Sequence, residues 1–326
     1  MKKNYSKILA AAFVAATSAF GAWADEVVVL QENFDKLEAV TDAGVHKYGK
    51  NPWTGKDAEG VEYQPNYSTL QTAGFVEDLN GWTSRTNWAY ACQGYVRISK
   101  TGFGGDLVSP KLTALNQPTD VKLSWQGIGY SSEPKANEDG SYKSGEKHDF
   151  QYYCVAVLGA GEIEGAAKTM DVAYKDADNK DITVKAAVVE IPSTSFITID
   201  TLQAWSFEGT KNVLTIKGAT AETQVAFMSV IPNFSTNKAD KTSSYVIKDG
   251  EGNVILPAAT DAPHGVNTGA NRVILDNIKV AYETVPTGIS DVTADKEVKA
   301  HKVIENGQVY IIAGDKKFNV MGAEVR

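Results

Sequence analysis

The sequence predicts an all-β protein of the sandwich or barrel class, and two observations lead to that prediction. Short alternating or β-branched runs recur along the chain, among them DVKLSWQG, FQYYCVAVL, QVAFMSVI and NRVILDNIKV. Gly, Asn, Asp and Pro separate these runs, and no segment carries a long apolar stripe at helical spacing. Many short strands broken by turn residues are typical of a sandwich or barrel, whereas an α/β protein would alternate strands with helices.

Residues 1–24 have the pattern of a secretory signal peptide. Three lysines precede an apolar run that ends at Ala22-Trp23-Ala24, an A-x-A cleavage site. A membrane anchor is the alternative, but Thr17 and Ser18 interrupt the run, which is shorter than the ~20 apolar residues of a spanning helix. We therefore expect cleavage after Ala24 and export of the mature chain.

The mature chain is acidic and contains two cysteines. Cleavage leaves 29 basic and 40 acidic residues, a formal net charge of −11, which argues against nucleic acids and anionic membranes as partners. Cys92 and Cys154 enter an oxidising compartment that permits a disulfide, yet each also fits a small apolar residue in an alternating strand. Both alternatives stay open, because sequence spacing does not give the Cα separation that a bridge requires.

Aromatic residues in long polar segments are the best candidates for ligand binding. Long connections inside a compact domain often carry function, and flat rings can stack on the apolar faces of sugars. We therefore select Trp53, Tyr67 and Tyr130 as candidate ligand-binding residues in loops. The alternating aromatics are instead expected to pack in the core, namely Trp88, Tyr90, Trp125 and Trp205.

The sequence contains no recognisable catalytic motif. The spacings H-E-x-x-H and G-x-S-x-G and the P-loop are absent, and the four histidines lie in unrelated polar contexts. A glycosidase needs two placed carboxylates, and the compact E-x-D-x-x-E strand of sandwich glycosidases is also missing. We expect a protein that is not an enzyme, and a lyase that uses a lone Tyr, His or Lys is a distant alternative.

The acidic stretch KDADNKDITV, residues 175–184, has two interpretations. Its acids approach the D-x-D-x-D spacing of a calcium loop, but the turn glycine and the final bidentate glutamate of such a loop are absent. The flanking β-prone runs and the Asp-Asn pair favour the tip of a hairpin.

The stretch NRVILDNIKVAYE raises a question about Asp276. Read as a strand with period two, it places Asp276 on one face with Ile274, Ile278 and Val280. A carboxylate that faces a core must be hydrogen-bonded, paired, bound to a cation or turned outward at a bulge, because its burial is costly.

Several short motifs together resemble a known family. They are ENFD, Gly81-Trp82, GGDLVSPKLTA, DVKLSW, Trp205-x-Phe207, NVLTIKG and RVILDNIKV. Their order resembles the secreted β-jelly-roll modules of Bacteroidetes, which are similar to cleaved-adhesin, MAM-like and carbohydrate-binding sandwiches. The resemblance spans roughly residues 26–283 and implies a jelly-roll sandwich over residues 25–285, with adjacent first and last strands. The extra length between Val230 and Asn271 departs from the compact form of these modules.

The same resemblance implies one structural calcium ion. Calcium takes six to eight oxygen ligands, and the acids at the corresponding positions are Glu32, Asp35, Asp106 and Asp276. The alternative is that Asp276 accepts backbone N–H groups at a bulge, Asn277 caps a turn and Glu32 is solvated.

The tail, residues 286–326, forms a separate unit in this interpretation. The turn signals Asn306-Gly307 and Gly314-Asp315 separate β-prone runs and predict a small meander of three strands. Its end, FNVMGAEV, resembles the C-terminal sorting domain of type IX secretion. That resemblance implies export through the outer membrane and attachment to surface polysaccharide, whereas a small stabilising β-appendage is the alternative.

Two functions from different classes follow. The first is a non-catalytic glycan-binding module that is secreted or held at the outer-membrane surface, with a polysaccharide or surface glycan as its partner. The alternative is a structural or adhesive surface protein that contacts another protein and binds no sugar.

Overall fold

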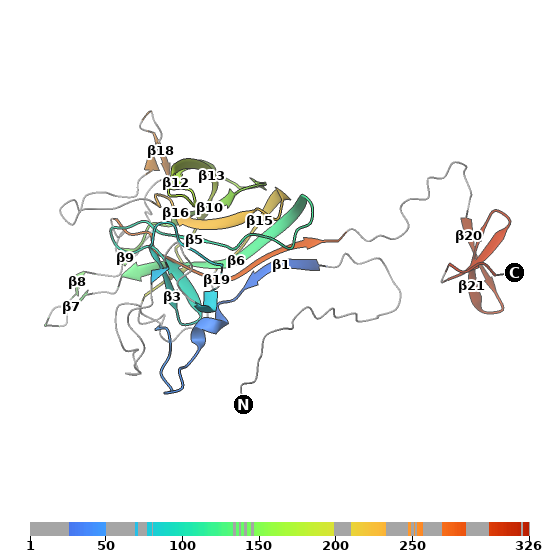
Figure 1. Ribbon diagram of the computed structural model, residues 1–326, viewed down its shortest axis with the longest axis horizontal. Helices are drawn as coiled ribbons and strands as arrows, with labels where there is room; N and C mark the ends of the chain where they lie inside the picture. The colour runs from blue at the N-terminus through green and yellow to red at the C-terminus, as the bar shows by residue number, and fades with distance from the viewer. Residues whose placement is uncertain are drawn as a thin grey trace. The chain divides into compact units, whose positions relative to one another are not determined.

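The computed structural model is built almost entirely of β-strands (Figure 1). It describes residues 26–49, 69–70, 77–79, 81–132, 135–136, 138–139, 142–144, 147–198, 210–232, 247–248, 251, 253–256, 269–284, 300–320 and 322–325. Its internal contacts divide the chain into a large unit, Glu26–Thr284, and a small unit that includes Val285–Arg326. Among the described residues, the helical segments are single 3₁₀ turns, η1 (Asp35–Glu38) and η2 (Glu77–Leu79), and no helix could cross a membrane.

The large unit contains a ten-stranded sheet and a five-stranded sheet. The main path of the first is β11 (Glu162–Glu164), β15 (Thr210–Ala219), β6 (Thr119–Ser132), β19 (Val273–Glu283), β4 (Tyr95–Ile98), β3 (Ala89–Cys92) and β2 (Thr69–Leu70). Beside this path, β1 (Glu26–Glu32) pairs with β19, and β6 also pairs with β9 (Lys147–His148) and β14 (Phe196–Ile197). The second sheet has the order β12 (Thr169–Lys175), β13 (Asp181–Glu190), β10 (Tyr152–Leu158), β16 (Gln224–Ser229) and β5 (Asp106–Val108).

Two short strand pairs complete the described part of the large unit. They are β7 (Lys135–Ala136) with β8 (Tyr142–Ser144), and β17 (Ile247–Lys248) with β18 (Val254–Leu256). Among the described pairs, only β14 with β6 is parallel, so the fold is essentially antiparallel. The prediction of an all-β sandwich is confirmed.

The main core lies between the two sheets. Along β10, Tyr153 and Val155 point into this core, whereas Cys154 points to the opposite side of the five-stranded sheet. Trp125 of the larger sheet meets Phe227 of the smaller one edge-on, with 5.4 Å between ring centroids. Trp125 Nε1 also donates a hydrogen bond to the Tyr153 hydroxyl, at 2.7 Å. The polar group of each ring is therefore hydrogen-bonded inside the core.

The two cysteines are free thiols on opposite outer faces of the sandwich. Cys92 belongs to a buried cluster on the outer side of the ten-stranded sheet, and Cys154 to a cluster on the outer side of the five-stranded sheet. With both sheets between them, a bridge would exceed the Cα separation of a disulfide. The second alternative from the sequence, small apolar residues in strands, therefore describes both cysteines.

Two local predictions from the sequence are confirmed. First, β1 and β19 pair antiparallel, from Glu26 opposite Glu283 to Glu32 opposite Ile278, so the first and last strands of the large unit are neighbours. Second, KDADNKDITV forms the hairpin between β12 and β13. At its tip, Asp176 Oδ1 accepts the backbone N–H groups of Asp178 and Lys180, both at 2.9 Å.

The described part of the small unit is a three-stranded antiparallel meander. It consists of β20 (Ala300–Glu305), β21 (Gln308–Ala313) and β22 (Lys316–Asn319). Asn306 and Gly307 both have positive φ, 52° and 77°, as a tight two-residue hairpin turn requires. The predicted meander is confirmed.

Candidate functional site

The candidate site lies on the outer face of the ten-stranded sheet, the side turned away from the five-stranded sheet. Strand register places Tyr90, Arg97 and Ile274 side by side across β3, β4 and β19. Two residues further along, the Tyr130 N–H donates to the Arg272 carbonyl, so these side chains form the next row of the same face. We call this region the aromatic half, and it comprises Trp88, Tyr90, Cys92, Tyr95, Arg97, Ile128, Tyr130, Ile197, Arg272 and Ile274.

Two arginines of the aromatic half lie against tyrosine rings. Arg97 is 1% exposed, and its guanidinium carbon lies 4.7 Å from the ring centroid of Tyr90. The guanidinium carbon of Arg272 lies 3.8 Å from the ring centroid of Tyr130. Cation–π contacts strengthen when water is excluded, and the planar guanidinium is held in one orientation. The aromatic half therefore holds two fixed groups of hydrogen-bond donors.

Asp149 fixes Arg272 from a second side. Arg272 Nε and Nη2 donate to its carboxylate at 2.6 and 2.7 Å, and the Arg272 backbone N–H donates at 2.9 Å. Asp149 is fully buried, whereas the Arg272 side chain retains 11% exposure. Bidentate pairs of this kind are both strong and geometrically specific, so Arg272 is a rigid group at the edge of the aromatic half.

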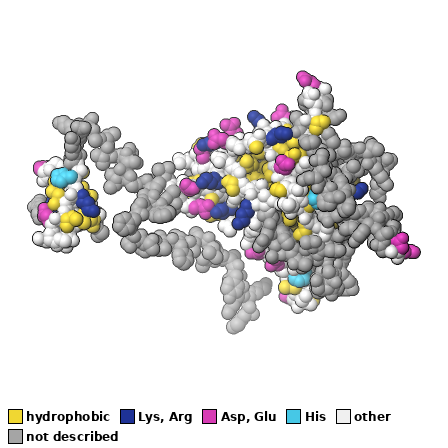
Figure 2. Space-filling model, turned by 180° about the vertical axis from the view of Figure 1, so that it is seen from behind, with side chains coloured by type: hydrophobic (Ala, Val, Ile, Leu, Met, Phe, Trp, Pro, Cys, Tyr) yellow, Lys and Arg dark blue, Asp and Glu magenta, His cyan; other side chains and the backbone are white. Residues whose placement is uncertain are grey.

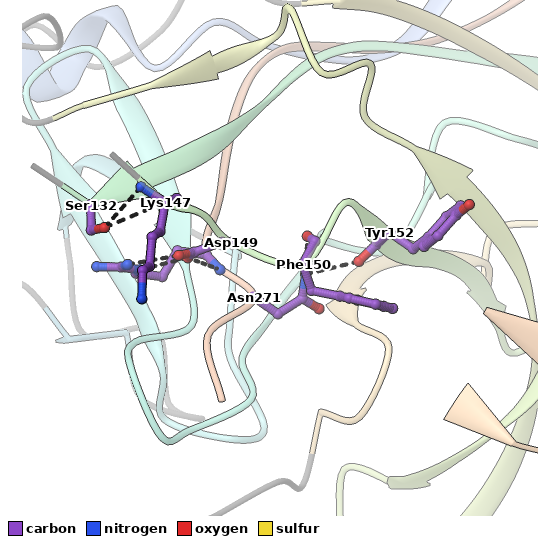
Figure 3. A network of polar contacts seen from close by, with 7 residues as sticks. Ser132, Lys147, Asp149, Phe150, Tyr152 and Asn271 are labelled. Carbon is purple, nitrogen blue, oxygen red and sulfur yellow. Dashed lines mark hydrogen bonds and ion pairs between the residues drawn. The ribbon is translucent and has the colours of Figure 1, made fainter. Parts of the chain in front are cut away.

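Asn271 anchors the segment that carries Arg272. Its Nδ2 donates to the carbonyls of Phe150 and Tyr152 at 3.0 and 2.8 Å, and its Oδ1 accepts the Val230 N–H at 3.1 Å. Figure 3 shows Asn271 between these two carbonyls, with Asp149, Lys147 and Ser132 beside them. The buried amide joins three chain segments with good geometry, which makes this region of the face rigid.

A second cation lies at the rim of the aromatic half. Lys100 Nζ lies 3.6 Å from the ring centroid of Trp88 and 4.2 Å from that of Phe103. The two ring centroids are themselves 4.6 Å apart. All three side chains are half-buried, so this cation and its rings reach the solvent.

The structure locates one of the three predicted ligand-binding aromatics. Tyr130 belongs to β6, is 6% exposed and packs under Arg272, so the prediction that it stands exposed in a loop is wrong. The reason is that the alternating pattern of β6 continues to Ser132, five residues beyond Gly127, where the polar stretch predicted as a loop begins. Trp53 and Tyr67 lie outside the described residues.

Asp276 lies on the same outer face, beyond the aromatic half, at a β-bulge. The register of β19 with β6 shifts between Asp276 and Lys279, and Asn277 adopts a left-handed φ of 50°. The bulge reverses the alternation, so Ile278 and Val280 point into the main core while Ile274 and Asp276 point outward. The prediction that all four share one face is wrong for Ile278 and Val280, and the bulge is the physical reason.

The environment of Asp276 is acidic. Burial raises the pKa of Asp276 to about 7, the hydrogen bond from the Asn277 N–H opposes this rise, and repulsion from Asp35, Glu32 and Glu38 adds to it. Burial also raises the pKa of Glu32, although its Oε1 accepts the Phe34 N–H at 3.0 Å. Three of the four predicted calcium ligands thus interact electrostatically at this position, which we call the acidic end.

Glu38 belongs to the acidic end but was absent from the predicted ligand set. A Cβ on Gly94 would lie 2.8 Å from Glu38 Oε1, so this carboxylate lies over the turn between β3 and β4. Its spacing from Asp35, one turn of the 3₁₀ segment η1, is the signal in the sequence that could have identified it.

Asp106 lies elsewhere, in the five-stranded sheet. Its buried carboxylate accepts the Ser84 hydroxyl at 2.8 Å, the backbone N–H groups of Arg85 and Thr86 at 3.0 and 2.9 Å, and the Tyr174 hydroxyl. The Thr86 hydroxyl donates as well, at 2.6 Å. The Asp106 carboxylate thus joins the segment 84–86 to the five-stranded sheet. The structure does not group Asp106 with Glu32, Asp35 and Asp276. Across the described residues, no three His, Cys, Asp or Glu side chains converge as ligands of a metal ion would.

The remainder of the outer face, which we call the charged half, is covered by exposed ion pairs. Lys122 pairs with Glu283 at 2.7 Å, Lys279 with Glu26 at 2.8 Å, and Lys217 with both Asp120 and Glu164. Figure 2 shows acidic and basic side chains interleaved over this end of the large unit. Balanced exposed pairs of this kind are typical of a solvated surface.

Comparisons with known proteins give no family assignment. No protein-family profile matches the chain, and no curated protein matches it. A solved structure of the CBM22-1 xylan-binding domain of Paenibacillus barcinonensis Xyn10C is 9% identical and covers 81% of this chain and 98% of its own, with a TM-score of 0.27.

Two cleaved adhesin domains of Lys-gingipain from Porphyromonas gingivalis W83 also show a weak likeness. The K3 domain is 14% identical and covers 79% of this chain and 99% of its own, with a TM-score of 0.27. The K1 domain is 13% identical and covers 77% and 96%, with a TM-score of 0.25. At TM-scores this low no property of these proteins transfers to this chain, so the fold assignment rests on the strand pairing alone.

Proposed function

We propose that this protein is a secreted or cell-surface module that binds a glycan, without catalysis, through the aromatic half of its outer face. The supporting observation is the pairing of arginines with aromatic rings in adjacent rows, Arg97 with Tyr90 and Arg272 with Tyr130. Sugars offer apolar C–H faces and pairs of oxygens, which aromatic faces and fixed N–H donors match.

The half-buried residues make the contacts in this proposal, and the buried ones hold them in place. Trp88, Lys100 and Arg272 retain access to solvent at the rim. Tyr90 and Tyr130 lie beneath them and fix the two guanidinium planes. Rigid groups of this kind lose little conformational entropy when a ligand binds.

The aromatic half supports binding better than hydrolysis. Glycoside hydrolysis uses two carboxylates that flank the scissile bond. Among the described residues, the carboxylate beside Arg272 is Asp149, and Arg272 binds both of its oxygens. We therefore assign no catalytic residue.

A structural or adhesive protein that contacts another protein is the second candidate. The burial of Tyr90, Tyr95 and Tyr130, each under 7% exposed, favours this alternative because a satellite core would have the same appearance. An open stacking platform would leave its rings more exposed.

A glycan array probed with residues 25–326 tests the proposal. We expect retention on a defined set of glycans, and at least about tenfold weaker binding for Trp88→Ala, because a stacking ring at the rim is lost. Tyr310→Ala in the small unit removes a comparable ring and serves as the matched control. Binding to no glycan, or equal losses in both variants, would contradict the proposal and favour a protein partner.

We also propose one structural calcium ion at the acidic end. Carboxylate oxygens are the donors that calcium prefers, and the charges of Asp35, Glu32 and Glu38 raise the pKa of Asp276, although the described carboxylates do not converge as ligands in this structure. Asp35 and Glu38 are exposed on η1 and can rotate toward an ion, whereas Asp276 is fixed in the bulge. Calcium would supply the positive charge that relieves this repulsion and would attach η1 to β19.

Export remains part of the proposal. The signal-peptide pattern of residues 1–24 and the FNVMGAEV end both indicate a surface or extracellular location. The signal peptide lies outside the described residues, and β22 contains the first two residues of the tail motif, Phe318 and Asn319.

A further inference from the structure

The described part of the small unit is a sheet without a buried core. Across residues 300–320 and 322–325 no residue is buried, whereas the large unit encloses a closed core between its two sheets. Three large apolar side chains of the small unit are strongly exposed, Ile304 at 66%, Ile311 at 43% and Val320 at 69%. Figure 2 shows hydrophobic side chains at the surface of this unit.

Strand register gathers the apolar side chains of the meander on one face. Ile304 on β20 lies opposite Val309 on β21, and Phe318 on β22 lies opposite Ile311 on β21. Val309 and Ile311 are two residues apart on the central strand, so they point to the same side. We call this side the apolar face, and it comprises Ile304, Val309, Ile311 and Phe318.

The opposite face of the meander carries polar contacts of its own. Lys317 Nζ lies 4.1 Å from the ring centroid of Tyr310 and also pairs with Glu305. The Tyr310 hydroxyl donates to Gln308 at 2.7 Å. Exposed contacts of this kind are typical of a solvated surface, so the apolar face is the side of the meander that needs a covering layer.

A sheet with one apolar face becomes stable when that face packs against another layer. Units of fewer than about 40 residues usually need disulfides, metals or oligomerisation for stability. Residues 285–326 contain no cysteine, and no described cluster of His, Cys, Asp or Glu could hold a metal ion. Oligomerisation is the route that this composition leaves.

The charge distribution favours a second copy of the same unit as the covering layer. Residues 285–326 contain six basic and six acidic residues, a formal net charge of zero. Residues 25–284 therefore carry the whole charge of −11 of the mature chain. Two small units can approach each other without net repulsion, whereas two large units repel each other.

We propose that the apolar face docks on the apolar face of a second copy of this chain, so that two meanders form one small β-sandwich. A two-fold axis between the sheets makes such a contact self-complementary, and facing sheets pack about 10 Å apart. Three strands of about six residues offer only about 300 Å² per copy. We therefore expect a weak dimer, with a Kd on the order of 100 µM. This inference goes beyond the proposed glycan-binding function and does not depend on it.

Sedimentation velocity of the mature chain, residues 25–326, tests the proposal. We expect a shift from monomer to dimer between about 5 and about 500 µM. Ile304→Thr with Ile311→Thr removes apolar surface but keeps β-branched side chains that suit a strand. Each change occurs twice in a symmetric interface, so we expect at least about tenfold weaker association.

A matched double variant in the large unit serves as the control. Val28 and Val213 are also exposed, at 44% and 63%, and lie on β1 and β15. Val28→Thr with Val213→Thr removes similar apolar surface there, and we expect less than about a twofold change in the Kd of the dimer.

Cross-linking tests the docking geometry with the sheet intact. Ile311→Cys introduces a thiol at the middle of the apolar face, and both natural cysteines are buried. Under mild oxidation we expect a covalent dimer. Gln308→Cys introduces a thiol at an exposed position of the opposite face, and we expect at least about tenfold slower cross-linking because docking does not bring these thiols together.

Three results in sedimentation would overturn the inference. They are a chain that stays monomeric at about 500 µM, equal losses in the two double variants, and dimers that persist after deletion of residues 286–326. Equal cross-linking of Ile311→Cys and Gln308→Cys would overturn it as well, because random collision would then explain the covalent dimer. None of these results bears on the glycan array, since Trp88 and the rest of the aromatic half belong to the large unit.

Discussion

The aromatic half and the charged half of one β-sheet face show how the same backbone can carry opposite kinds of surface. In the charged half, β6, β15 and β19 point exposed lysines and acids outward, and Lys122, Lys217 and Lys279 each pair with a carboxylate in a neighbouring strand. In the aromatic half, β3, β4, β6 and β19 point tyrosines, isoleucines and Arg97 outward, and these side chains are buried. The difference lies only in the outward positions, because the inward positions of both halves supply the same apolar core.

The acidic end separates these two surfaces. The bulge at Asp276 and Asn277 is the point where β19 exchanges β4 for β1 as its neighbour. The shift in alternation lets one strand serve two partners while keeping its apolar side chains in the core. A bound proton or a nearby cation would each relieve the unfavourable charge of a carboxylate at this junction, and this links the bulge to the proposed calcium ion.

The largest expected effect concerns the ion pairs of the two halves. Asp149→Ala would leave the largely buried Arg272 without its bidentate partner and should lower the free energy of unfolding by about 3–5 kcal/mol. Glu283→Ala breaks the exposed pair with Lys122 and should leave the midpoint of urea unfolding almost unchanged. Equal losses in the two variants would show that the halves do not differ in the way described.

The next effect concerns the pH dependence of stability at the acidic end. The folded-state pKa of Asp276, about 7, lies above its ordinary value of 3.8, so the native state binds this proton more tightly than the unfolded state does. The contribution of the neutral carboxyl is therefore complete below about pH 4 and is lost as the pH rises through about 7, a loss on the order of 3 to 4 kcal/mol. In chelator, Asp276→Asn should be more stable than the natural protein at pH 8.

Calcium should reduce that difference. At a hundredfold excess over Kd, calcium would stabilise the natural protein by about 2.7 kcal/mol and would leave Asp276→Asn unaffected. Thermal melts at pH 8 with calcium and with chelator measure both effects. Asp106→Asn cannot replace Asp276→Asn in this test, because the Asp106 carboxylate holds a separate hydrogen-bond network. A melt insensitive to calcium, with Asp276→Asn destabilised in chelator, would identify Asp276 as a simple strand-end acceptor.

The smallest expected effect on stability comes from removing the small unit. Deletion of residues 286–326 should leave the melting of the large unit, and both halves of its outer face, unchanged within about 1 kcal/mol, because each unit makes its own contacts. The same deletion should trap the protein in the periplasm of a Gram-negative host, as cell fractionation would show. Surface display of the truncated chain would contradict the sorting role of the tail.

Much of the fold was predictable because it depends on local patterns. Alternation identified the major strands, and the turn residues Asn306-Gly307 and Asp178-Asn179 marked hairpins that the structure contains. The pairing of β1 with β19 followed only from a resemblance, since a contact of that sequence separation leaves no local signal. The sequence pattern did not predict the bulge at Asn277, which reverses the alternation of side chains along β19. The bulge depends on the pairing of β19 with two partner strands, and this pairing leaves no local signal.

The site was less predictable than the fold, for a physical reason. In GYVRIS, alternation places Arg97 opposite to Val96 and Ile98, which marks an arginine on a non-core face. Only register shows that this arginine lies one row from Arg272, since β4 and β19 are separated by about half of the chain. The polar stretch GIGYSSEPKANEDGSYKSGEKHD predicts a loop at Tyr130, yet the neighbouring Gly129 lies within β6, where a Cβ would meet the Phe196 ring at 2.4 Å.

Hydrogen–deuterium exchange with and without glycan tests the central claim most directly. The mature chain is compared alone and saturated with the glycan that it binds most tightly on the array. We predict slower exchange in residues 88–100, 147–149 and 270–274, which form the aromatic half and its rim, and unchanged exchange in residues 119–124 and 210–217 of the charged half. Protection confined to the charged half or to residues 300–320, or no protection at saturation, would contradict the assignment of the aromatic half as the binding surface.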